Sequence, residues 1–193
     1  MVKVKVSAKS AHLHFHGCDP QYIADVCHGR CCEGSNGLMV SVHKTEIAAL
    51  EMYGVTFSRP PGMVVDSLLL VPRNPEKRGS AQLCSFKTSK HLCSLHGAGP
   101  KPFGCVASPF TLNKNNTLIV RNRYKLLRCY NDGPRFPAYV AFRASLDLIF
   151  GTTESARICT HLAEGGGDIV AEMTELNWCI LRDNDAAKPK VVG

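Results

Sequence analysis

Alternating apolar and polar residues predict short β-strands in the first half of the chain. Residues 2–7 alternate valine with lysine, and residues 12–16 place His12, His14 and His16 opposite two apolar side chains. A further strand is expected over Leu38 to Val42, followed by a helix of about ten residues that ends at Gly54.

The segments between and after these elements differ in character. Residues 110–128 are typical of a β-hairpin whose second strand runs into a basic stretch. Two short strands are expected within residues 55–72, followed by a surface loop to residue 80. Residues 18–36 and 84–110 are rich in glycine and proline, so we expect mostly loop there, without a long helix.

Helical spacing of apolar residues dominates the last third of the chain. It covers residues 138–150 and 153–163, and a third helix is expected over residues 169–181. No internal repeat or linker is evident, so residues 1–193 are predicted to form one α+β domain. In that domain residues 138–185 are the helical C-terminal part, and short strands lie around a loop-rich, cysteine-organised front part.

The composition excludes several classes of protein. The 193 residues are 45% hydrophobic and 20% charged, which suits an ordinary buried core. No apolar run approaches the ~18 residues of a membrane-spanning helix. The N-terminus has no continuous apolar stretch of the kind found in secretory signals. We therefore expect a cytoplasmic protein with no membrane partner.

Ten cysteines are the most unusual feature, and eight of them are clustered. In a reducing compartment such richness is typical of metal or redox chemistry. Loops rich in glycine and proline suit it, because the chain must wrap closely around a metal. Cys159 and Cys179 stand alone in helical apolar patterns, so we expect them to pack as small apolar side chains. The eight candidate metal ligands are Cys18, Cys27, Cys31, Cys32, Cys84, Cys93, Cys105 and Cys129.

The spacing of these cysteines leaves the number of metal centres open. Zinc and iron–sulfur clusters are held by four donors, with Zn–S distances of about 2.3 Å. The side chains of the adjacent Cys31 and Cys32 are expected to diverge. Two neighbouring centres, or one centre beside a buried thiol, are therefore both consistent with the sequence.

Six cysteine-containing or flanking motifs follow one another along residues 15–135. They are Cys27-His28-Gly29-Arg30-Cys31-Cys32, Val40 to Leu50 with Glu46-Ile47, Cys84-Ser85-Phe86, Cys93-Ser94-Leu95-His96, Lys101-Pro102-Phe103-Gly104-Cys105 and Pro109-Phe110. In this order they resemble the YkgJ-type cysteine-cluster family, a zinc- or iron-chelating domain described by eight cysteines. The resemblance implies that the first eight cysteines bind the metal, and Lys101 stands where that family usually has an arginine.

The identity of the metal would determine the class of function. Zinc held by four thiolates would be structural, whereas an iron–sulfur cluster would permit redox chemistry. Some members of the family are labelled iron–sulfur oxidoreductases or flagellin lysine methylases, so the resemblance leaves an iron–sulfur redox or protein methyl-transfer enzyme as an alternative. The sequence shows no P-loop, Gly-x-Ser-x-Gly or His-Glu-x-x-His motif, and whether the chain is an enzyme stays open.

Two further groups of residues suggest binding. His12, His14 and His16 would form a metal-binding face if residues 12–16 were a strand, although an exposed polar edge is the preferred interpretation. If their segment were a strand, Arg121, Arg123 and Lys125 would share one basic face that could bind nucleic acid, as in a zinc module for nucleic acid or a protein partner, although a solvated basic face is the preferred interpretation. The formal charge of +7 supports this only weakly, because metal-bound thiolates would lower it.

Overall fold

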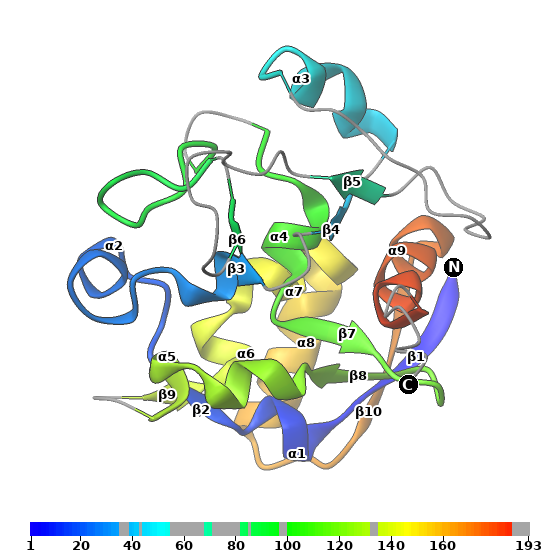
Figure 1. Cartoon of the computed structure of the whole chain (residues 1–193). Helices are drawn as coiled ribbons and strands as arrows, with labels where there is room; N and C mark the ends of the chain where they lie inside the picture. The colour runs from blue at the N-terminus through cyan, green and yellow to red at the C-terminus, as the bar shows by residue number, and fades with distance from the viewer. Residues whose placement is uncertain are drawn as a thin grey trace, which may run out of the picture.

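The computed structural model shows an α+β fold around a four-stranded mixed sheet (Figure 1). Short helices and three two-stranded sheets surround the main sheet. The α+β class predicted from the sequence is confirmed. The residues that the structure describes are 1–34, 39–42, 44–54, 68–70, 82–84, 86–96, 100–131 and 135–186.

The main sheet joins the two ends of the chain to a central hairpin. Its order is β10-β1-β8-β7, in which β1 runs parallel to β8 and the other neighbours are antiparallel. The β7–β8 turn is held by Asn113, whose side-chain oxygen accepts hydrogen bonds from the backbone of Asn115 and Thr117. The four strands are β1 (Val2–Val6), β7 (Phe110–Leu112), β8 (Thr117–Val120) and β10 (Ile169–Met173).

The small sheets pair segments of the front part and the middle of the chain. Each is antiparallel and two-stranded. They pair β2 (His14–Phe15) with β9 (Phe136–Pro137), β3 (Glu33–Gly34) with β6 (Gln82–Leu83), and β4 (Met39–Ser41) with β5 (Leu68–Leu70).

Most of the helices are short, and the longest lie near the C-terminus. The α-helices are α1 (Ala8–Ala11), α2 (Pro20–Tyr22), α3 (Ile47–Glu51), α4 (Phe103–Ala107), α5 (Arg128–Asn131), α6 (Ala138–Ala141), α7 (Arg143–Phe150), α8 (Thr152–Ala163) and α9 (Glu175–Ala186). A π-helix, η1 (Ile23–Cys27), and three 3-10 helices, η2 (Arg30–Cys32), η3 (Lys44–Glu46) and η4 (Asn122–Leu126), complete them. Of these described helices, none is long and apolar enough to cross a membrane.

Two hydrophobic cores divide the fold. The larger core buries one face of the main sheet against α7 and α8, with Phe15, Leu146 and Ile158 fully enclosed. The smaller core is made by Val40, Val42, Leu50 and Leu95. The segments that carry it include α3, which is drawn in cyan above the sheet in Figure 1. Cysteines lie at the margins of both cores: Cys31 and Cys129 pack on the larger one, and Cys84, Cys93 and Cys105 pack on the smaller one.

Several predicted elements are confirmed. The alternating valines form β1 with Val4 and Val6 buried, and residues 110–120 form the expected hairpin. The helix after β4 stops near Gly54, whose φ of 71° suits glycine, and Gly151 with φ of 81° separates α7 from α8. Of the two strands expected within residues 55–72, only residues 68–70 are described. The loop expected over residues 72–80 lies outside the described residues.

The helix predicted over residues 169–181 is wrong in its first part. Residues 169–173 form β10, which pairs with β1 in a register that places Val170 opposite Lys5 and Met173 opposite Val2. The burial of this segment alternates with a period of two, and its first two residues are β-branched, which favours a strand. The C-terminal part is therefore not wholly helical but also supplies an edge of the main sheet.

The strand predicted over residues 12–16 is shorter than expected. His12 ends helix α1, and only His14 and Phe15 are in β2. The loop predicted over residues 18–36 instead contains α2, η1 and η2. Asp19 begins this helical segment, because its side chain accepts a hydrogen bond from the backbone N–H of Tyr22 and Pro20 occupies the first helical position.

Candidate metal centre

A cavity of about 320 Å³ lies where the cysteine-bearing segments meet. Its wall is formed by residues 17–32, residues 91–96 with Lys101, residues 124–129, and Phe142. Six of the eight cysteines predicted to bind metal line it, namely Cys18, Cys27, Cys31, Cys32, Cys93 and Cys129. The fold therefore brings together thiols that are up to 111 positions apart in the sequence.

A tight turn at residues 28 and 29 precedes Cys31 and Cys32 at the cavity wall. After η1, His28 and Gly29 both adopt left-handed backbone conformations, with φ of 53° and 56°. A Cβ on Gly29 would lie 2.7 Å from the backbone oxygen of His91, so the absent side chain lets the two segments touch. The rings of His28 and His91 also pack, with centroids 4.5 Å apart. This contact fixes Cys31 and Cys32 relative to Cys93.

Cys31 and Cys32 point toward the same space, contrary to the prediction that adjacent side chains diverge. Their Sγ atoms are 4.0 Å apart, because η2 turns the backbone between them. Two sulfurs of a tetrahedral zinc–thiolate site lie about 3.8 Å apart, from a Zn–S distance of about 2.3 Å. The spacing of this pair is therefore compatible with ligation of one metal.

Hydrogen bonding and nearby charge make the pKa values of Cys31 and Cys32 differ. The hydrogen bond with Cys31 lowers the pKa of Cys32 to about 6, and the cations Lys101, Lys87 and Arg123 act in the same direction. The same hydrogen bond, together with burial, raises the pKa of Cys31 well above its ordinary value. The pair thus loses its first proton more easily at Cys32 than at Cys31, and the thiolate is the form that binds metals.

The second group of cysteines is held by the smaller core. Burial raises the pKa of Cys84 to about 11 and raises that of Cys105 further, and the charge of Cys32 contributes in both cases. Cys105 lies in α4, where the carboxylate of Glu46 accepts a hydrogen bond from the backbone N–H of Phe103 at 3.1 Å. Glu46 therefore ties the smaller core to the helix that carries Cys105.

The charge of Lys101 acts on cysteines of both groups. Lys101 lines the cavity, and its positive charge lowers the pKa values of Cys18, Cys32 and Cys105 against the effect of burial. Its ammonium also lies 3.3 Å from the Nδ1 atom of His96. A lysine in this position compensates the negative charge of thiolates gathered in a partly buried site.

The thiols are gathered but not arranged as a finished coordination shell. Among the residues that the structure describes, no three His, Cys, Asp or Glu side chains are placed as a set that could hold a metal ion. Their chemistry nevertheless suits a soft metal: seven thiols act on one another's pKa values, and three cations lie beside them. Metal binding would require the side chains to close by rotation.

The two remaining cysteines lie elsewhere. Cys159 packs on the larger core, as predicted, and its thiol lies 3.7 Å from the backbone oxygen of Tyr139. Cys179 is half-buried in α9. Neither lines the cavity.

The histidine face considered for residues 12–16 does not form. Both ring nitrogens of His12 face backbone oxygens, those of Ala8 at 2.9 Å and Leu162 at 3.2 Å. The ring of His16 stacks on Tyr22 with centroids 3.6 Å apart. The three imidazoles therefore have separate environments.

The shared basic face predicted for Arg121, Arg123 and Lys125 is also wrong. Residues 122–126 form η4 instead of continuing the strand, so alternation no longer places these side chains together. Arg123 lies over the ring of Tyr124, 5.3 Å from its centroid, and its charge acts on Cys32. Lys101, which stands where the resembled family usually has an arginine, was not a candidate ligand but lines the cavity together with Tyr124.

Comparison of the chain with protein-family models, curated proteins and solved structures found no match. The resemblance to the cysteine-cluster family therefore remains a prediction, and the functional interpretation depends on the geometry above.

Proposed function

We propose that this protein binds zinc or iron through its clustered cysteines, in one or two centres that join its two hydrophobic cores. The observation that carries the proposal is the cavity lined by six predicted ligands from three separate segments. Cys84 and Cys105 lie close enough to act on the same thiolates from the smaller core. The ligand set is the eight-cysteine set of the family that the sequence resembles.

The position of the cysteines favours a structural role for the proposed metal. The smaller core has four buried apolar side chains among the described residues, and cores of this size usually need a metal or disulfides. A centre with ligands from both margins would crosslink the two cores, and its binding free energy would then contribute to folding. The Cys32 thiolate and Lys101 support this by supplying one deprotonated ligand and a compensating charge.

The identity of the bound metal would distinguish a structural role from an enzyme activity. Anaerobically purified protein should be analysed for zinc, iron and acid-labile sulfide, with its visible spectrum. Colourless protein with one or two zinc ions per chain would support the structural role. Iron with stoichiometric sulfide would favour the redox or methyl-transfer alternative. Protein with neither metal after reconstitution with each would contradict the proposal.

Paired variants test the ligand set. We expect the Cys31→Ser/Cys32→Ser variant to lose metal, whereas the control Cys159→Ser, which alters a half-buried thiol outside the cavity, keeps it. Cobalt(II) substitution gives a second measurement, because sulfur-to-cobalt charge-transfer absorption reports thiolate ligation directly. Unchanged metal content and unchanged cobalt spectra in the double variant would refute the proposal. A cytoplasmic location is part of it, since thiol ligands need a reducing compartment.

A further inference from the structure

Strand β10 forms one edge of the main sheet, and its outward backbone groups can be identified. The backbone N–H of Lys5 donates to Asn116 O, so Lys5 directs its backbone toward β8 and away from β10. In an antiparallel pair, a residue whose N–H and C=O point away from the partner strand lies opposite a residue whose N–H and C=O also point away. Val170 lies opposite Lys5 and Glu172 lies two residues further, so both present backbone groups at the open edge.

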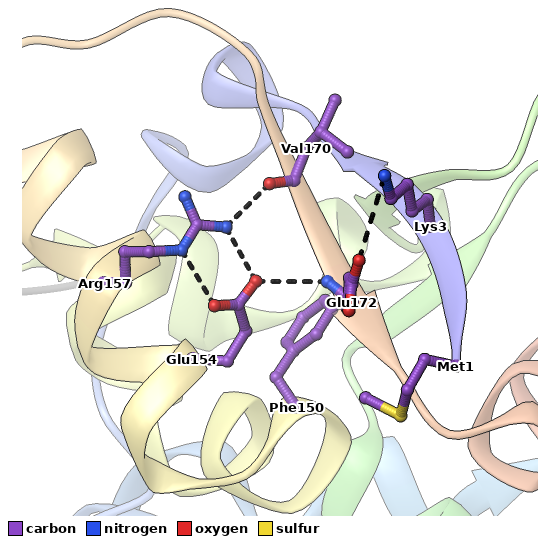
Figure 2. Close-up of a pocket in the computed structure, with 7 residues that line it drawn as sticks. All are labelled: Met1, Lys3, Phe150, Glu154, Arg157, Val170 and Glu172. Carbon is purple, nitrogen blue, oxygen red and sulfur yellow. Dashed lines mark hydrogen bonds and ion pairs between the residues drawn. The ribbon is translucent and has the colours of Figure 1, made fainter.

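An ion pair from α8 occupies these edge groups. Arg157 donates two hydrogen bonds to the Glu154 carboxylate, at 2.8 and 2.7 Å, and a third to Val170 O at 2.7 Å. The same carboxylate accepts a hydrogen bond from the backbone N–H of Glu172 at 3.1 Å. Figure 2 shows the pair reaching from the helix to the strand.

The hydrogen bonds of this pair follow the pattern of a neighbouring strand. In a parallel ladder, a residue that lies opposite residue i of the neighbouring strand donates to the C=O of residue i−1 and accepts from the N–H of residue i+1 of that strand. The guanidinium and carboxylate make these two bonds to Val170 and Glu172, around Ala171. The pair thus takes the place of one residue of an added strand.

Without this ion pair, the β10 edge would favour association with another chain. Val170 is 58% exposed, and the strand borders a groove of about 480 Å³ that is also lined by Met1 and Phe150. The charge of Glu172 is partly countered by Lys3, 3.9 Å away on β1. Exposed β-branched residues on an unblocked edge are a typical site of pairing between chains. The opposite edge, β7, lies against α9, where the Thr111 hydroxyl donates to Leu181 O.

We propose that the Glu154–Arg157 pair blocks the β10 edge and prevents it from pairing with the same edge of a second copy of this chain. A two-fold axis beside Ala171 would bring the outward groups of Val170 and Glu172 onto those of the partner, because a strand edge is self-complementary. The pair withholds one acceptor and one donor from that contact. Removing it leaves both groups available.

The test compares self-association of the full-length protein with and without the pair. We expect the wild type to sediment as a monomer and the Glu154→Ala/Arg157→Ala variant to show a concentration-dependent rise to twice the chain mass, with at least about tenfold tighter association. The matched control is Arg143→Ala/Asp147→Ala, which removes a pair on α7 joined at 2.8 Å. This control should remain monomeric.

Two further measurements assign any dimer to the β10 edge. The amide of Glu172 should exchange more slowly at high concentration of the double variant than at low concentration. Adding Val170→Lys, which places a charge on the edge, should restore the monomer. The proposal is overturned if the double variant stays monomeric at all concentrations, if Val170→Lys does not restore the monomer, or if the wild type itself dimerises and Val170→Lys abolishes that dimer.

Discussion

Replacing Gly29 with alanine should weaken the contact that holds the first cysteines against the 86–96 turn. The new Cβ would lie 2.7 Å from a backbone oxygen, that of His91, which cannot move without shifting the turn itself. The backbone of Gly29 is also left-handed, with φ of 56°, and alanine in that region costs about 1–2 kcal/mol. Adding the close contact, we expect a loss of about 2 kcal/mol in unfolding free energy, within the range of about 1–3 kcal/mol for strained backbone sites.

The matched control for this variant is Gly17→Ala. Gly17 also lines the cavity, but a Cβ there would meet no atom within 4 Å. For a chain of this length, about 1 kcal/mol corresponds to a shift of about 2–4 °C in the melting temperature, so Gly29→Ala should melt about 4–8 °C lower. Calorimetry on both variants under identical conditions measures the difference. Melting temperatures within about 1 °C of each other would show that the close approach of residues 29 and 91 is not what fixes the site.

Three other predictions concern residues around the two cores. Glu46→Ala removes the acceptor at the start of α4 and should cost about 1 kcal/mol in denaturant unfolding, whereas Glu46→Gln, which keeps an acceptor for the N–H of Phe103, should cost less. The hydrogen bonds from its arginine partner hold the pKa of Glu154 below its usual 4.5, so the stabilisation by its carboxylate is complete above that pH and is lost as the pH falls through the folded-state pKa. Urea unfolding of wild type and Glu154→Gln should therefore differ at pH 7 and converge in acid; a constant difference would contradict this. His12→Ala should lose about 1–2 kcal/mol, because its ring meets two backbone oxygens, without loss of metal, and His14→Ala, an exposed residue, should change neither stability nor metal content.

Local signals were sufficient where one residue type determines the backbone. Gly54 and Gly151 mark helix ends because each takes a positive φ, and the alternation of valine and lysine specifies β1 without reference to any other segment. Ile169 to Met173 shows the limit of such signals. Five residues with mixed apolar character fit either period, and their pairing with β1, more than 160 positions away, makes them a strand.

The candidate site was likewise predicted in part from local sequence signals. Clustering along the sequence predicted that the cysteines meet, and six of the eight candidate ligands line one cavity. Their mutual placement did not follow, because it depends on contacts such as Gly29 with His91 and Glu46 with Phe103, which join segments 62 and 57 positions apart. The direction of Cys31 and Cys32 was predicted wrongly because a 3-10 turn, not visible in the spacing, turns both sulfurs to one side.

The two-core architecture also determines what a fluorescence experiment on this protein would measure. The chain has a single tryptophan, Trp178, which packs on the larger core, donates to the side chain of Asn116 and lies under the guanidinium of Arg182. Its emission therefore reports the larger core alone. If metal loss releases the smaller core first, the tryptophan signal will stay native while thiol reactivity rises. Disagreement between these two signals would identify a partly unfolded, metal-free intermediate.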